Sequence, residues 1–249
     1  DLDGSSPQVK AGINSPLPFS KSAVYGALRL VMDPNIPNSA GWYRLVEVRA
    51  PEASVVNGRL PAACGARGIT GLRLMDAVLG ALAQAVPERV PADGEGGNTI
   101  LSIGGYDADL RPFAFVDLFA GARGGRPIGD GPDGVPHPAA NISNTPVEVA
   151  EVELPIRFEE YGLLQDTGGA GKFRGSLSHV RRVCCLADEA TLQLRSDKRR
   201  FPPYGLWGGK PGHPSWNILR PGDGEVILPT MGTAPMRRGD VIMHIMASG

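Results

Sequence analysis

The chain has 249 residues, of which 42% are apolar, and its formal net charge at pH 7 is -1. This apolar content is enough for one large or two small domains with a sizeable core. The near-zero charge gives no electrostatic reason to bind nucleic acid or an anionic membrane, and no run of about eighteen apolar residues is present to cross a bilayer. We therefore expect a soluble protein with neither nucleic acid nor membrane as a partner.

The three cysteines, Cys64, Cys184 and Cys185, form no disulfide framework and no C-x-x-C metal spacing. Two of them are adjacent in an expected strand, where their side chains point to opposite faces. This usage favours a reducing cytoplasm. The chain opens with neither an initiator methionine nor a signal peptide, so we expect a piece of a longer protein.

The first third of the chain predicts an α+β arrangement. Apolar residues recur at helical spacing over Lys21–Asp33, and Pro34 ends this helix. A second amphipathic helix is expected over Gly71–Val86, with Pro87 as its end. Between the two helices, the stretch WYRLVEVRAPEASVVNG predicts a strand followed by a turn.

A β-hairpin is expected next, with strands over Thr99–Gly104 and Pro112–Ala120. In the second strand, the period-2 rule places Asp117 on the same face as three phenylalanines, Phe113, Phe115 and Phe119. A carboxylate among aromatic rings is either a pKa-tuned acid, base or ligand-orienting group, or a buried Asp that is hydrogen-bonded or paired with an arginine.

A long loop, residues 121–144, follows without periodicity. Loops of this length in compact domains are functional or disordered, and this one is rich in Gly, Pro and Asn, which favours an ordered functional loop. It supplies three candidate site residues, His137, Asn141 and Asn144; for His137 a solvated imidazole is the alternative. A cap, a proline and an acid at residues 145–148 then predict a short helix over Val147–Glu153.

Strand-like runs recur from Ile156 onward, separated by glycine- and proline-rich turns, which favours a sandwich or barrel-like unit. The expected strands are IRFEEYGLL, SHVRRVCCL, ATLQLRS, SWNILR, EVILP and DVIMHIM. The predicted fold class is α+β, with a helix-containing part over residues 1–153 and a β-rich part over residues 154–249.

The stretch DTGGAGKFRGS, Asp166 to Ser176, resembles a phosphate-binding loop at first sight. The strict pattern G-x-x-x-x-G-K-[ST] fails, because Asp166 stands at the first glycine and Phe173 at the hydroxyl position. A strand rather than a helix is expected after it. We interpret the stretch as a glycine-rich turn in which positive φ angles cost little.

Other patterns give no catalytic or metal motif. The four histidines lack metal-ligand spacing, and no G-x-S-x-G elbow is present. The segment RSDKRRFPPYGLWGGKPG gathers cations around aromatic residues, which favours a protein interface or a rigid corner over direct nucleotide contact. These cations are Arg195, Lys198, Arg199, Arg200 and Lys210.

Several stretches together resemble the B-type subunit of the hydantoinase, 5-oxoprolinase and acetone carboxylase family, in the right order over nearly the whole chain. They are NSPLPFSKSAVYGALR, LGALAQAVPERVPA, NTPVEVAEVELPIRFEEYGLLQDTGGAGKFRGS and LRSDKRRFPPYGLWGGKPG. The resemblance implies the C-terminal part of a B-type subunit that acts with an A-type subunit, where ATP and Mg²⁺ are expected. The substrate would be a cyclic amide in a hydrolase or a ketone in a carboxylase, and a non-catalytic assembly module is a third hypothesis.

Two departures from the family pattern limit what carries over. B-type subunits are about twice this long, and the resemblance places any divalent metal in the N-terminal half, so we expect no metal ligand here. The family loop HTHMTNTRNTP reads PHPAANISNTP in this chain. Asn141 and Asn144 match it, His137 falls between two family histidines, and Asp117 stands where glutamate is common. These four residues are the candidate catalytic set.

Overall fold

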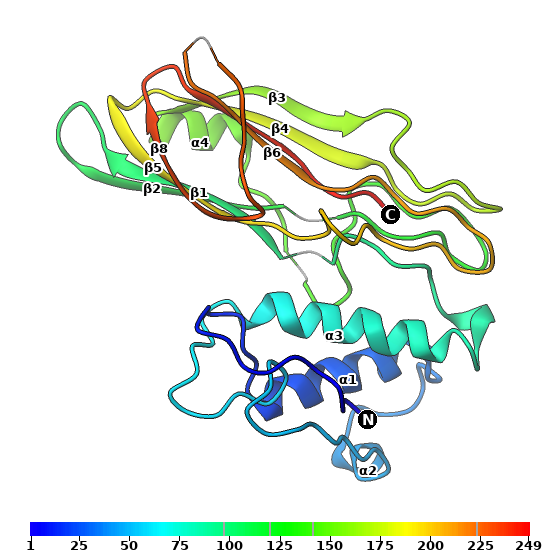
Figure 1. Cartoon of the computed structure of the whole chain (residues 1–249). Coiled ribbons are helices and arrows are strands. Elements are labelled where there is room, and N and C mark those ends of the chain that lie inside the picture. Colours follow the sequence, from blue (N-terminus) through cyan, green and yellow to red (C-terminus); the bar gives the residue numbers. More distant parts are fainter. Residues whose placement is uncertain (97, 120, 141, 223) are drawn as a thin grey trace. The chain divides into compact units, whose positions relative to one another are not determined.

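The computed structural model describes residues 1–96, 98–119, 121–140, 142–222 and 224–249. The chain divides into two compact units, Asp1–Pro91 and Ala92–Gly249 (Figure 1). The sequence pattern placed a division near residue 153 instead. The difference arises because the first strand of the predicted hairpin pairs with Glu189–Arg195, a strand of the predicted β-rich part. The hairpin and that strand therefore belong to one unit.

The N-terminal unit is helical. Its helices are α1 (Leu17–Val31), α2 (Ala40–Tyr43), α3 (Arg67–Leu82) and the 3-10 turn η1 (Pro87–Arg89). The two long helices confirm the predicted ones, although each begins about one turn earlier, and they pack side by side (Figure 1).

The strand expected from Trp42 onward is wrong. Trp42 lies in α2, and turns and extended segments without a named strand follow it. A strand needs a neighbour to accept its backbone hydrogen bonds. Here the aromatic rings decide the local structure instead, because Trp42 and Tyr43 both pack against Tyr25 of α1, with ring centroids 5.7 and 4.7 Å away.

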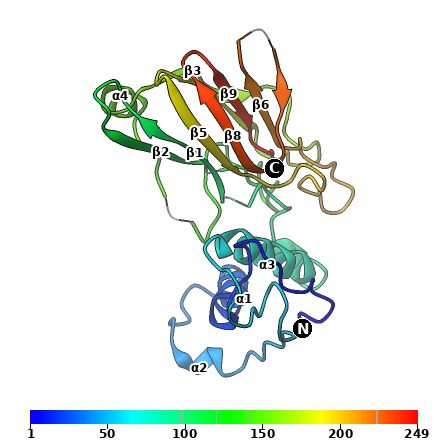
Figure 2. The ribbon, with the colours of Figure 1, turned by 60° about the vertical axis from the view of Figure 1, so that its left-hand side comes forward.

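The described residues of the C-terminal unit form two antiparallel sheets and one helix. Its elements are β1 (Thr99–Tyr106), β2 (Pro112–Phe119), α4 (Val147–Glu153), β3 (Ile156–Leu164), β4 (Ser178–Cys185), β5 (Glu189–Arg195), β6 (Trp216–Arg220), β7 (Val226–Ile227), β8 (Met231–Arg237) and β9 (Val241–Ile245). The strand orders are β2-β1-β5-β8 and β3-β4-β9-β6-β7, and both sheets are open at their edges (Figure 2). The α+β class is confirmed, and the sandwich rather than the barrel describes these strands.

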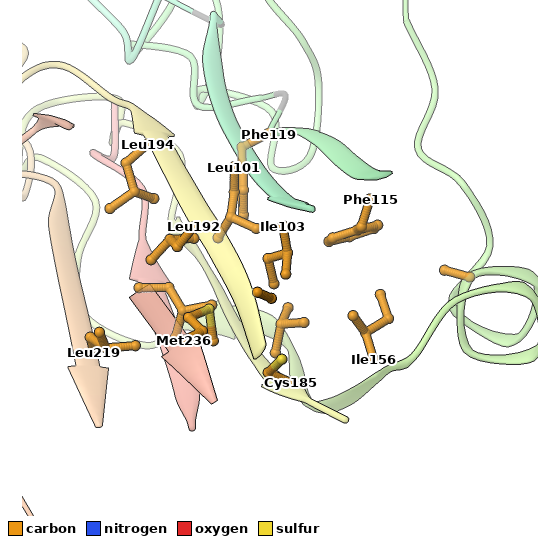
Figure 3. Close-up of a cluster of buried hydrophobic side chains, with 14 of the residues drawn as sticks. Leu101, Ile103, Phe115, Phe119, Ile156, Cys185, Leu192, Leu194, Leu219 and Met236 are labelled. Carbon is orange, nitrogen blue, oxygen red and sulfur yellow. The ribbon is translucent and has the colours of Figure 1, made fainter. Parts of the chain in front are cut away.

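The hydrophobic core of the C-terminal unit lies between the two sheets (Figure 3). One sheet contributes Ile103 and Leu192, and the other contributes Val183 and Ile242, all fully buried. Alternation along each strand explains this, since every second side chain faces the opposing sheet.

Strand β8 was not predicted from the sequence. Its residues MGTAPMR contain glycine and proline, which are depleted in strands. It nevertheless pairs along its whole length with β5. An edge position tolerates the proline, because no second neighbour needs its missing N–H.

Candidate functional site

A row of polar residues crosses the inner face of the five-stranded sheet. Tyr161 on β3 stands opposite Arg181 on β4, Arg181 opposite His244 on β9, and His244 opposite Asn217 on β6. Residues directly opposite one another share a face of the sheet. We call these four residues the polar row. Three of them are buried almost completely; Tyr161 is half-exposed.

Arg181 is the centre of this arrangement and has a relative exposure of 1%. One terminal nitrogen of its guanidinium, Nη1, donates to Asp117 Oδ2 across the sandwich, and Nη2 donates to the Tyr161 hydroxyl at 2.8 Å. The guanidinium also lies 4.3 Å from the ring centroids of both Phe119 and Tyr161. A buried cation requires such compensation, because burying it unpaired would cost several kcal/mol.

The sequence left two alternatives for Asp117, a pKa-tuned functional group or a buried carboxylate paired with an arginine. The structure shows the second, the pairing with Arg181. Asp117 shares its face with buried aromatic residues, as the alternation predicted. Its second oxygen, Oδ1, accepts a hydrogen bond from Asn144 Nδ2 at 3.2 Å, and the same nitrogen donates to the Leu118 carbonyl at 2.7 Å. The structure thus brings two of the candidate residues together and fastens the end of the long loop to β2.

The hydrogen bonds around His244 assign its tautomer. Asn217 Nδ2 donates to Ser196 Oγ at 2.9 Å and to the Pro229 carbonyl at 3.0 Å, so the amide oxygen of Asn217 faces His244. That oxygen lies 2.6 Å from His244 Nδ1, which must carry the proton. Nε2 then presents a lone pair, and it is buried without a hydrogen-bond partner among the described residues.

Burial keeps both histidines of this region neutral. Burial, and then the nearby Arg181, lowers the pKa of His244 to about 3. The same two causes lower the pKa of His179 to about 4. His179 lies two residues before Arg181 on β4 and shares its face. Two neutral imidazoles beside a buried cation avoid like-charge repulsion.

The long loop packs against this end of β4. A Cβ on Gly134 would lie 4.0 Å from His179 Nε2. Asp133 accepts hydrogen bonds from the Leu177 amide at 2.7 Å and from Arg174 Nη2 at 2.9 Å. The hydrogen bond from Arg174 is the largest cause that lowers the pKa of the Asp133 carboxyl. The loop is thus ordered by contacts of its own, as its composition indicated.

His137 occupies a turn in this loop. It is buried rather than solvated, its Nδ1 accepts a hydrogen bond from the Ala139 amide at 3.2 Å, and its carbonyl accepts one from the Ala140 amide at 2.8 Å. Asn141 lies outside the described residues. Among the residues that the structure describes, no group of three His, Cys, Asp or Glu side chains could hold a metal ion.

The stretch Asp166–Ser176 is a packed connection between β3 and β4, and the helix that a P-loop requires does not follow it. Its glycines are needed for close backbone approach, whereas the sequence suggested positive φ angles. A Cβ on Gly168 would lie 2.4 Å from the Gly175 carbonyl oxygen, and one on Gly169 would lie 2.6 Å from the Lys210 carbonyl oxygen. In this stretch only Asp166 has a positive φ, 59°.

Two of the clustered cations are structural. Lys198 is buried and forms an ion pair with Asp93. Arg199 donates from Nε to the Ser215 carbonyl at 2.5 Å, and its guanidinium lies 4.6 Å from the ring centroid of Trp216. Because Lys198 and Arg199 are engaged within the protein, the segment does not offer all five cations to a ligand.

Sequence patterns did not single out any member of the polar row as a candidate site residue. A weak signal exists in β4, where His179 and Arg181 occupy the same alternate positions as buried apolar residues. Which strands bring their polar residues into one row depends on the register, which the alternation does not specify.

Comparisons with known proteins identify the family. The model of the hydantoinase B/oxoprolinase family matches residues 1–249. Over 220 residues, the chain is 33% identical to a protein of Pseudomonas sp. (strain NS671) described as the putative B-type subunit of a D-/L-hydantoinase, in an alignment that covers 86% of this chain and 37% of that protein.

Two solved structures share the fold of this chain. The ATP-dependent caprolactamase from Pseudomonas jessenii superposes with a TM-score of 0.88 at 25% identity, over 99% of this chain and 45% of that one. A nucleotide-free acetone carboxylase superposes with a TM-score of 0.81 over 98% of this chain and 38% of that one, but at 16% identity it shows the fold alone. The chain spans less than half the length of each of these three relatives. None of the helices in the described residues has the length and apolarity that a membrane crossing needs.

The match over every residue of the chain, together with the shared fold, shows that this protein belongs to the hydantoinase B/oxoprolinase family.

Proposed function

We propose that this chain is the C-terminal part of the B-type subunit of an ATP-dependent cyclic-amide hydrolase, acting with an A-type partner and with the remainder of its own subunit. The observation that carries the proposal is the likeness of the whole chain to the ATP-dependent caprolactamase, in fold and at 25% identity. The likeness to the hydantoinase of Pseudomonas sp. supports the same reaction class and the subunit arrangement.

The chemistry accounts for the need for ATP. An amide nitrogen and a hydroxide are poor leaving groups, whereas phosphate is a good one, so phosphorylation of the substrate activates it for attack by water. We assign ATP and Mg²⁺ to the A-type partner, where the developing charge of the transferred phosphoryl group would be stabilised. This chain would help to complete the reaction on the activated substrate, in a cytoplasmic complex.

Within this chain, we assign Asp117 and Asn144 to positioning the long loop. Arg181 neutralises Asp117, which accepts a hydrogen bond from Asn144, so a contact between the sheets fixes the end of the loop. His137 and Asn141 remain candidates on the same loop for contact with substrate. A fixed loop orients such groups and thereby lowers the entropic part of the barrier.

The test uses the full-length subunit with its A-type partner. Hydrolysis of 5-oxoproline, a hydantoin or caprolactam, coupled to ATP consumption, is the expected result. Turnover of a ketone that requires bicarbonate and gives a carboxylated product would reject the hydrolase and identify a carboxylase.

A loop variant tests the assigned role. Asn144→Ala should reduce turnover about tenfold or more, since small misplacements of catalytic groups cost that much, whereas Ser143→Ala, at an exposed neighbouring position, should not. Full turnover of the Asn144 variant with an intact complex would instead support an assembly module without a catalytic loop.

A further inference from the structure

The loop that joins β5 to β6, residues 196–215, exposes three aromatic rings on the C-terminal unit. The relative exposures are 73% for Phe201, 43% for Tyr204 and 75% for Trp207. Isolated exposed apolar residues are ordinary, but clustered aromatic residues are enriched at protein interfaces. We call these three residues the aromatic cluster.

The loop that displays this cluster is held in one conformation. Its backbone bonds to itself, with the Gly212 amide donating to the Pro203 carbonyl at 3.0 Å and the Gly209 amide donating to the Leu206 carbonyl at 2.9 Å. It also bonds to the neighbouring connection, since the Lys210 amide donates to the Ala170 carbonyl at 2.8 Å.

Trp207 adopts a φ of 52° in this loop, a left-handed conformation that is unfavourable for a bulky residue. Gly205 packs so closely against the Gly209 backbone that a Cβ would lie 2.3 Å from it. The surrounding contacts thus hold Trp207 where most of its side chain remains in water. A loop that is already ordered loses little further entropy when it binds a partner.

Three exposed cations accompany the aromatic cluster, namely Lys172, Arg200 and Lys210. Within the described part of the chain, none of them has an ion pair, and the segment from Lys198 to Gly212 contains no acidic residue. The Arg200 guanidinium lies 5.4 Å from the Phe201 ring centroid, and the backbone of Lys210 contacts the connection that carries Lys172. Positive charge is therefore local to this surface, because the whole chain has a net charge of -1.

We propose that the aromatic cluster and its three cations form a docking surface for a segment of the A-type partner that carries carboxylates beside apolar side chains. This inference rests on the proposed function, which supplies the partner. Carboxylates would pair with these cations, and burial of the rings against apolar side chains of the partner would remove their apolar surface from water.

The experiment measures binding rather than turnover. The full-length subunit and the A-type partner are mixed, and the dissociation constant is determined by calorimetry at two salt concentrations. Trp207→Ala should weaken binding about tenfold or more, as expected for an aromatic hot spot. Arg200→Glu and Lys210→Glu should also weaken it, and the salt dependence should decrease because fewer ion pairs form.

Matched controls lie at the opposite end of the strands. Tyr106→Ala removes a ring with 62% exposure, and Arg237→Glu reverses an exposed cation; both should leave the dissociation constant within about twofold of the original. Circular dichroism of each variant shows whether it is folded.

Two outcomes overturn the inference while the proposed function stands. One is partner binding that is unchanged in the Trp207 and Arg200 variants. The other is that these variants lose self-association of the subunit, or ATP binding by the complex, while the dissociation constant for the A-type partner stays the same. If no A-type partner associates with the unaltered protein, the proposed function fails as well, so the two failures are distinguishable.

Discussion

Replacing Arg181 with methionine would leave the Asp117 carboxylate buried opposite an apolar side chain of similar length. Removing one partner of a buried ion pair costs about 3–5 kcal/mol, mostly because the remaining charge has no compensation. Arg181 also lies over two aromatic rings, but methionine recovers part of that contact. Asn144 still donates to Asp117, which offsets part of the loss. We expect the variant to lose about 3–4 kcal/mol of unfolding free energy.

The double variant Arg181→Met/Asp117→Leu separates the charge from the packing. Neither charge is then buried, so the loss should shrink to about 1–2 kcal/mol, which covers the larger side chain at position 117 and the loss of the hydrogen bonds. Asp117→Leu alone should cost more than the double variant, because it leaves the Arg181 cation unpaired.

Native-state hydrogen exchange of the amides in β4 and β9 measures these free energies in the C-terminal unit alone. Because the chain contains two units, a single global unfolding transition would mix their stabilities. Losses in the single and double variants that are equal, or a loss below about 1 kcal/mol in Arg181→Met, would refute the buried ion pair.

Three further expectations follow from burial and backbone packing. The pKa of His244 is about 3 in the folded chain and about 6.5 when unfolded, so stability is full above pH 6.5 and falls as pH drops below it. Between pH 6 and 4, His244→Gln should make the slope shallower by about 1.4 kcal/mol per pH unit when the free energy is measured by hydrogen exchange of the β9 amides, and an equal slope would contradict the burial. Gly168→Ala should cost several kcal/mol, since its Cβ would overlap a carbonyl oxygen, whereas Gly162→Ala meets nothing within 4 Å and should be tolerated in thermal melts. Burial raises the pKa of both thiols in β4, so neither Cys184 nor Cys185 should react with a thiol reagent until the protein unfolds; rapid labelling of either one in the native state would show the strand to be open.

Local pattern was sufficient for much of the fold. The periodicity of α1 and α3 and the alternation in β2 each depend on a few consecutive residues, and the structure confirms them. The same alternation correctly placed Asp117 on a face with aromatic side chains. The pattern failed at Trp42 and at β8, where packing against Tyr25 and pairing with β5 outweigh the intrinsic preferences of the residues.

The candidate site could be predicted from the sequence only in part. Composition indicated that the long loop is ordered, and the resemblance to the family selected Asn144, which contacts Asp117. The arginine partner of Asp117 could not be named, because it lies 64 residues away on the other sheet.

The sequence by itself determined most of the segments that become helices and strands, which side of β2 faces inward, and to which family the chain is similar. The tertiary structure decided which inward residues meet. Tyr161 and Arg181 are 20 residues apart, and Asn217 and His244 are 27 apart, so their contacts depend on strand order and register. A shift of one residue in any of these strands would turn its polar side chain outward. Gly169 and Gly175 follow the same logic, since the backbones that they approach, at Lys210 and Gly249, belong to other parts of the folded unit.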